Sequence, residues 1–303
     1  MPQLHAHEPS RLFKTELSQL LHQNDSYKQS CTHSLRFNFH GVPIALHFET
    51  KQQADELRSF LPNHWIDVST KPHEVYWLQA KNQGMDQTQF HDDADAELEL
   101  RYIDKSEVAI QRDFLGMVKS DHSLFVCDAS VSDGFFNAWR WLLPRYLVQK
   151  QAYLLHSCGV VAPCGEATLF IGPSGAGKST VASLAKDHLI LGDDCIIVTK
   201  KDGEYYVETG AIGQNPNFLG PIGETFRLKH VYFINQAAFN RRVPIKTSEA
   251  SRRLIREMIY PGWHSIDMPT SQLVFAWVSE FVQNTVPNRL DFNLTIDLKE
   301  YTA

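Results

Sequence analysis

The stretch LFIGPSGAGKST, residues 169–180, decides how the C-terminal half of this chain is expected to fold. Its spacing of glycines, lysine and hydroxyls fits a phosphate-binding loop, in which backbone N–H groups converge on the phosphates and the lysine reaches the β and γ oxygens. The strand-like ATLFI precedes the loop, and a helix is predicted over 178–187, so the positive helix end would also face the phosphates. A chance glycine turn, the alternative, does not account for this order of strand, loop and helix.

The loop is therefore predicted to hold a nucleotide together with Mg²⁺. Ser179 is expected to place its hydroxyl on the metal ion, and Lys178 is expected to take part in catalysis. The residues predicted to contact the nucleotide are Gly172, Pro173, Ser174, Gly175, Ala176, Gly177, Lys178, Ser179 and Thr180.

Two consecutive aspartates, Asp193 and Asp194, follow the apolar run LILG. Only one short helix separates them from Lys178, so their strand, predicted over 189–198, is expected to lie beside the strand that enters the loop, with both acids facing the phosphates. One acid would hold Mg²⁺ and the other would accept a proton from an attacking hydroxyl. We assign Asp193 as the base and Asp194 to the metal. A solvated Gly-Asp-Asp turn is the alternative, because turns favour these residues.

The order HSCGVV, GPSGAGKST and LILGDD resembles the catalytic domain of HPr kinase/phosphorylase and its relatives, which share a P-loop fold with phosphoenolpyruvate carboxykinase. The resemblance covers residues 150–200 best. It implies an α/β kinase domain that binds ATP and Mg²⁺, with His156 near the phosphates, and it implies a homo-oligomer, because members of that family form rings. For His156, a hydrogen-bonded histidine at a strand end is the alternative.

One signature of that family is absent. The Leu-Glu-x-Arg-Gly stretch tied to HPr phosphorylase activity has no counterpart in residues 208–230. The resemblance is therefore to the related proteins that act on other serine- or threonine-like hydroxyls, in proteins, peptides or small molecules.

Two further features are candidates for parts of the transfer site. Arg241 and Arg242 are candidates for a cation on the transferring phosphoryl group, among other basic residues of the C-terminal half. The glycine- and proline-rich stretch 210–223 is predicted to be a mobile loop over the acceptor site, and an inert surface connection is the alternative.

Length and composition indicate two domains. A chain of 303 residues, 43% of them hydrophobic, is long enough for two cores. Residues 1–130 are predicted to form an α+β domain that helps to present the substrate, with helices over 11–21 and 52–61 and a hairpin over 35–48. Residues 131–150 are predicted to be a connecting helix that Pro144 kinks or ends, and residues 151–303 the kinase domain, which closes with a strand over 290–298.

Charge and hydropathy exclude some partners. The formal charge of −6 gives no electrostatic reason to bind nucleic acid or an anionic bilayer. No signal-like or membrane-spanning segment is recognisable, and the five cysteines form no CxxC pair. A cytoplasmic protein with reduced cysteines is expected.

These observations predict an ATP-dependent kinase that transfers the γ-phosphate to a hydroxyl acceptor. The alternative is a nucleotide-gated binding module, in which ATP orders a loop and no phosphate is transferred.

Overall fold

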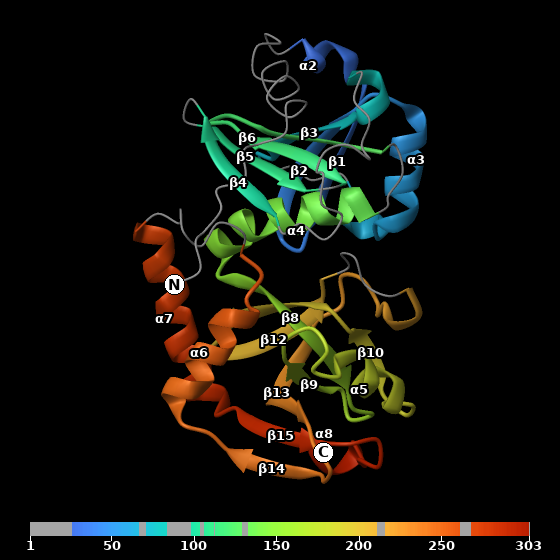
Figure 1. Cartoon of the computed structure of the whole chain (residues 1–303). Coiled ribbons are helices and arrows are strands. Elements are labelled where there is room, and N and C mark those ends of the chain that lie inside the picture. The colour runs from blue at the N-terminus through green and yellow to red at the C-terminus, as the bar shows by residue number, and fades with distance from the viewer. Residues whose placement is uncertain are drawn as a thin grey trace, which may run out of the picture. The chain divides into compact units, whose positions relative to one another are not determined.

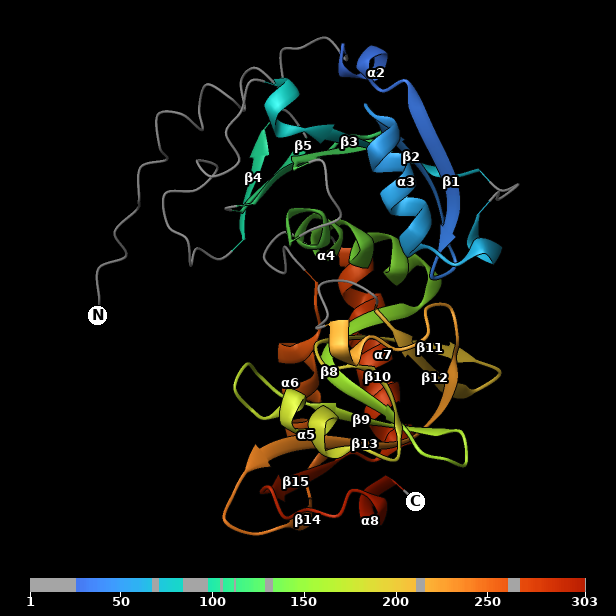
Figure 2. The same ribbon diagram turned by 90° about the vertical axis from the view of Figure 1, so that its right-hand side faces the viewer.

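The structure is a computed structural model with a mixed α/β fold and two sheets (Figures 1 and 2). The chain divides into two compact units, Met1–Trp139 and Arg140–Ala303. The helix predicted over 11–21 lies outside the described residues. The structure describes residues 26–66, 71–83, 98–103, 106–111, 113–128, 133–210, 216–260 and 268–302.

The first unit is built on a mixed sheet in the order β1-β2-β3-β7-β6-β5-β4. Its strands are β1 (His33–Phe39), β2 (Val42–Phe48), β3 (His73–Gln79), β4 (Glu99–Ile103), β5 (Ser106–Gln111), β6 (Phe114–Val118) and β7 (Ser123–Cys127). The predicted hairpin is confirmed, because β1 and β2 pair in antiparallel fashion around Gly41. The predicted helix is confirmed as α3 (Lys51–Phe60), which begins at a capping box between Thr50 and Gln53. The short α2 (Tyr27–Ser30) precedes β1.

The division between the units falls inside α4 (Asp133–Leu147), between Trp139 and Arg140. Of the two effects expected of Pro144, a kink or the end of the helix, the second is wrong, since α4 continues to Leu147 and then into a 3₁₀ turn, Val148–Lys150. Pro144 removes one intrahelical hydrogen bond, and only three residues of α4 follow it. The buried side chains of Leu143 and Leu147 hold the last turn of the helix in place.

The second unit contains an eight-stranded sheet that closes on itself. Strand β8 pairs with β9, β9 with β13, β13 with β12, β12 with β11, and β11 with β8 again. Strands β9, β13 and β15 run parallel to one another, so their carboxyl ends share one edge. The strands are β8 (Ala152–Val161), β9 (Glu166–Ile171), β10 (Leu189–Gly192), β11 (Cys195–Lys201), β12 (Glu204–Thr209), β13 (Phe226–Gln236), β14 (Arg241–Pro244) and β15 (Asn288–Phe292).

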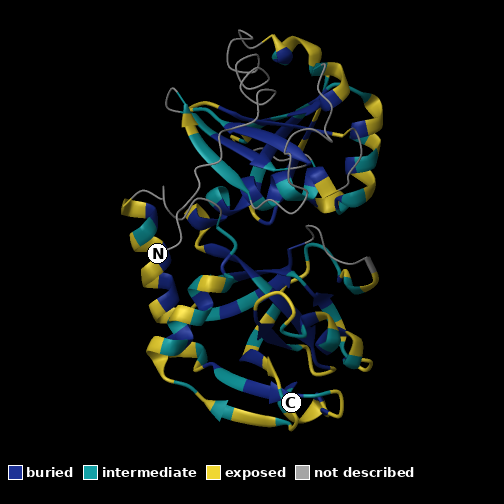
Figure 3. Ribbon diagram, in the orientation of Figure 1, coloured by how far each residue is buried: buried dark blue, intermediate teal, exposed yellow. Residues whose placement is uncertain are grey.

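Helices cover the sheet of the second unit on both faces (Figure 3). On one face, α6 (Thr247–Glu257) and α7 (Met268–Thr285) bury Leu254, Trp277 and Phe281 against the strands. On the other, α5 (Lys178–Leu184) buries Val181 and Ala182, and α8 (Lys299–Thr302) lies beside β9. Within the part of the chain that the structure describes, no helix is long and apolar enough to cross a membrane.

The arrangement of the acidic strand differs from the expectation. The run predicted as one strand over 189–198 is two strands, β10 and β11, which are interrupted at Asp193 and Asp194. Both pair with β8, which lies between them and β9, because β8 and β9 form a hairpin and leave the other edge of β8 free for pairing. The strand predicted over 290–298 ends at Phe292, and the helix predicted over 178–187 ends at Leu184.

Candidate active site

The loop between β9 and α5 has a backbone that requires glycine. Gly175 and Gly177 have φ values of +76° and +105°, a backbone conformation that residues with a side chain rarely adopt. A Cβ built on Gly177 would lie 2.7 Å from Cζ of Phe292, and one on Gly172 would lie 2.8 Å from Cβ of Ala176. The end of β15 therefore packs closely against the loop, and another residue at these glycine positions would strain the loop.

Two side chains fix the loop further. Gln236, the last residue of β13, donates a hydrogen bond from Nε2 to the carbonyl oxygen of Gly175 at 2.8 Å. Lys178 donates from Nζ to the carbonyl oxygens of Gly172 at 2.8 Å and Pro173 at 3.1 Å. Burial lowers the pKa of Lys178, and the nearby carboxylates, Asp194 first, oppose this. The ammonium is thus held over the loop by neutral carbonyl groups.

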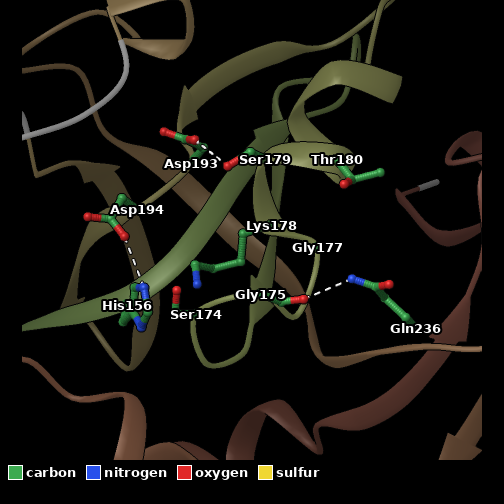
Figure 4. A pocket seen from close by; sticks show the side chains of 10 residues that line it. All are labelled: His156, Ser174, Gly175, Gly177, Lys178, Ser179, Thr180, Asp193, Asp194 and Gln236. Carbon is green, nitrogen blue, oxygen red and sulfur yellow. Dashed lines mark hydrogen bonds and ion pairs between the residues drawn. The ribbon is translucent and has the colours of Figure 1, made fainter.

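The loop borders a cavity of about 510 Å³ (Figure 4). This volume is in the range of small-molecule sites. Every residue that lines it belongs to the second unit. The lining residues are His156, Ser174, Gly175, Gly177, Lys178, Ser179, Thr180, Asp193, Asp194 and Gln236.

Both aspartates reach the cavity because the strand is interrupted where they stand. Successive residues of a continuous strand point to opposite faces, so one of the two carboxylates would have pointed away. Between β10 and β11 the chain instead passes Ser157 of β8, whose N–H donates to the carbonyl oxygen of Asp194 at 3.1 Å. The hydroxyl of Ser179 donates to Oδ2 of Asp193 at 2.7 Å.

Asp194 has different partners from Asp193. Its Oδ1 lies 2.9 Å from Nε2 of His156, and its Oδ2 accepts a hydrogen bond from the guanidinium of Arg140 on α4. The second ring nitrogen of His156, Nδ1, lies 3.1 Å from Oε2 of Glu257 at the end of α6. Asp194, His156 and Glu257 thus form a connected row of polar side chains, of which Asp194 and His156 line the cavity.

These contacts set the charges of Asp194 and His156. Burial opposes ionisation of Asp194, but hydrogen bonding to His156 and the charge of Arg140 outweigh it and lower its pKa to about 2. Burial likewise opposes protonation of His156, but its bonds to Asp194 and Glu257 raise its pKa above the ordinary 6.5. The carboxylate is therefore ionised at neutral pH, and the imidazole is biased toward its cationic form.

The stretch 210–223 was predicted to cover the acceptor site, and residues 211–215 of it lie outside the described residues. Two of its glycines are anchored on either side of the aspartates. The N–H of Gly210 donates to the carbonyl oxygen of Cys195 at 2.9 Å, and that of Gly220 donates to the carbonyl oxygen of Leu191 at 3.2 Å. These bonds hold the start of the stretch and a residue near its end next to the acidic pair.

The structure brings most of the predicted residues together around the cavity. The predicted residues that line the cavity are His156, Ser174, Gly175, Gly177, Lys178, Ser179, Thr180, Asp193 and Asp194, whereas the predicted nucleotide contacts Gly172, Pro173 and Ala176 are not among its described lining residues. Among its described lining residues, neither Arg241 nor Arg242 is found. Arg241 instead lies with its guanidinium carbon 5.1 Å from the centre of the Phe239 ring, and Arg242 is exposed on β14.

Three residues of the site were not identified from the sequence: Arg140, Gln236 and Glu257. Arg140 and Glu257 stand on helices distant in the chain, and nothing in their neighbourhood marks them. Gln236 had a usable signal, because it is a polar residue at the end of a buried strand, where ligands of α/β sheets gather.

The metal-binding capacity of the site is limited to a few oxygens. Among the described residues, no group of three or more His, Cys, Asp and Glu is arranged to hold a metal ion. Ser179 and Asp193 offer two adjacent oxygen donors at the loop. These hard donors fit Mg²⁺, which usually takes one or two protein ligands and completes its shell with phosphates and water.

No family model matches the chain, and no curated protein matches it. Its function is therefore inferred from the site itself.

Proposed function

We propose that this protein is an ATP-dependent phosphotransferase of the P-loop kinase type, which transfers the γ-phosphate to a hydroxyl acceptor. The observation that carries the proposal is the separation of two carboxylates within one cavity beside a glycine-rich loop. Asp193 is hydrogen-bonded to Ser179 of the loop, whereas Asp194 is held by His156 and Arg140. A site that only bound a nucleotide would need the first carboxylate and not the second.

The loop would hold the phosphates of ATP. Its backbone N–H groups and the ammonium of Lys178 are the donors, and Lys178 would exchange its bonds to Gly172 and Pro173 for phosphate oxygens. Ser179 and Asp193 would hold Mg²⁺, which when bound neutralises charge on the β and γ oxygens. The hydrogen bond between these two residues favours Asp193 for the metal, the reverse of the assignment made from the sequence.

Asp194 would then orient the acceptor. Because its pKa is low, it stays ionised and can accept a hydrogen bond from a hydroxyl at any physiological pH. Asp194 need not be a strong base, since phosphoryl transfer depends mainly on positioning and on stabilisation of charge; the hydroxyl proton would pass to it as the new O–P bond forms and ADP leaves. His156, as a cation beside Asp194, and Arg140 would add positive charge near the phosphoryl group that moves.

The nucleotide-gated module remains the second candidate because of one observation. Asp194 is already paired with Arg140 and His156, so an acceptor must compete for the carboxylate. In the gated alternative these ion pairs would persist when ATP binds, and no phosphate would be transferred.

Mass spectrometry of acceptors distinguishes the two. The protein is incubated with ATP, Mg²⁺ and a cell extract, and peptides and small molecules are searched for the gain of one phosphoryl group. Lys178→Ala should weaken ATP binding in calorimetry and lower product formation by about 100-fold or more. Lys186→Ala, which alters an exposed lysine just beyond α5, is the matched control and should change neither. Tight ATP binding by wild type with no phosphorylated product in any fraction would favour the gated module.

A further inference from the structure

The cavity has two chemically different ends. In Figure 4, His156 and Asp194 lie on one side of Lys178, and Thr180 and Gln236 lie on the other. The present inference rests on the proposed function, in which the transferred phosphoryl group lies beside Asp194. The nucleoside of the donor must then extend in the opposite direction, past Gln236.

Two loops lie beyond Gln236, at the carboxyl ends of β13 and β15. They are residues 237–240 and 293–298. Both loops leave from strand ends that contact the glycine-rich loop, because Gln236 bonds to Gly175 and Phe292 lies against Gly177. The three-residue span from Gln236 to Phe239 reaches at most about 11 Å. That distance is within the length of a nucleotide.

The two loops are fixed to each other by hydrogen bonds. The N–H of Asn293 donates to Oδ1 of Asn240 at 2.8 Å, and Nδ2 of Asn293 donates to the carbonyl oxygen of Ala238 at 2.9 Å. Nδ2 of Asn240 donates to Oγ1 of Thr295 at 3.2 Å, and the N–H of Thr295 donates to Oδ1 of Asn293 at 2.9 Å. The surface that they form is therefore organised before any ligand arrives.

This surface carries large apolar side chains that are left in solvent. Phe239 is 51% exposed and Leu294 is 72% exposed, one on each loop. The guanidinium of Arg241 lies over the Phe239 ring and also lies 3.9 Å from Asp291, which is buried, so it is positioned from two sides. An aromatic ring backed by a cation and beside an aliphatic side chain suits a flat, polarisable ligand.

We propose that Phe239, supported by Arg241, is the stacking platform for the nucleobase of the phosphoryl donor, with Leu294 at its edge. Arg241 thus acts at the base and not at the transferred phosphoryl group. The side-chain amides of Asn240 and Asn293 are engaged with the loops themselves, so the base is held by stacking and its edges are not read. Because every nucleobase has a π face, ATP and GTP should bind within a few-fold of each other.

Calorimetry with three ligands tests this: ATP, GTP and inorganic tripolyphosphate, each with Mg²⁺. Phe239→Ala should lower the affinity for ATP and GTP by about tenfold, the order expected for loss of one stacking contact with the base. The affinity for tripolyphosphate should not change. Phe239→Trp should restore the affinity for both nucleotides. Phe275→Ala removes an equally exposed phenylalanine from α7, outside the loops, and should change none of the three.

The outcomes separate this inference from the proposed function. Unchanged ATP affinity in Phe239→Ala, or an equal loss for tripolyphosphate, would overturn the base platform and leave the phosphate site standing. Wild type that binds ATP no more tightly than tripolyphosphate would do the same. Wild type that binds neither ligand would overturn both the platform and the phosphotransferase.

Discussion

Asp193 and Asp194 are adjacent in the chain but bound to different partners, so replacing each of them with asparagine should impair activity in a different way. Asp193→Asn weakens a metal ligand, and its activity should fall about 10²- to 10³-fold and recover in part as Mg²⁺ is raised. Asp194→Asn removes the acceptor's partner, and it should keep ATP affinity and stay inactive at every Mg²⁺ concentration. Steady-state rates against Mg²⁺ measure both. Rescue of Asp194→Asn and not Asp193→Asn would restore the assignment made from the sequence.

His156 makes a prediction about pH. Its pKa is raised in the folded protein, so its bonds to Asp194 and Glu257 stabilise the fold fully below the unfolded value of 6.5, and this contribution is lost as pH rises through the folded pKa. Wild type should therefore exceed His156→Gln in unfolding free energy at pH 5.5 to 6.5, by a margin that shrinks toward higher pH. Denaturant titrations from pH 5.5 to 9 measure the margin.

A matched variant isolates the cause. Glu257→Gln removes one of the two carboxylates that raise the pKa of His156. The stabilisation by His156 should therefore be lost at a lower pH than in wild type. Asp194 contributes no pH dependence between pH 5.5 and 9. Because its pKa is lowered, the stability that it contributes is lost only as pH falls from 3.8 toward about 2. A margin that stays constant from pH 5.5 to 9 would contradict the raised pKa.

At the scale of elements, the join between β9 and α5 depends on Gly177. Gly177→Ala would place a methyl group against Phe292 in a backbone conformation that costs about 1–3 kcal/mol, and ATP affinity should fall by about tenfold or more. Gly203→Ala is the control, since φ is +86° in the turn between β11 and β12 and nothing lies within 4 Å of its Cβ. It should lower stability without changing ATP affinity, as calorimetry and thermal unfolding would show.

The elements also explain how far the sequence alone could go. Gly177, Lys178 and Ser179 were recognisable because a phosphate loop is built from consecutive residues whose spacing the chemistry dictates. The position of the acidic strand was not recognisable, because a strand can pair along either edge of a neighbouring strand. Here the β8–β9 hairpin occupies one edge of β8 and leaves only the other edge for β11. Arg140 reaches Asp194 across a separation of 54 residues, which no local pattern reveals.

At the scale of the molecule, two cores predict two unfolding transitions. Phe125→Ala empties the core of the first unit and Phe281→Ala that of the second, each at a cost of about 3–5 kcal/mol, and each should lower one transition in calorimetry. ATP should raise only the transition that Phe281→Ala lowers, because every residue that lines the cavity belongs to Arg140–Ala303. A single transition shifted by both variants would contradict independent cores.

The closed sheet of the second unit has one weak seam. β12 and β13 are paired through only two positions, Tyr206 with Arg227 and Val207 with Phe226. The exposed Arg227 reinforces them through ion pairs to Glu204 on β12 and Glu166 on β9. Such pairs are screened by salt, so local opening should begin here and become more frequent as ionic strength rises. Amide hydrogens that β12 and β13 donate to each other at these two positions should therefore exchange faster in 1 M salt, while those inside β8 stay protected.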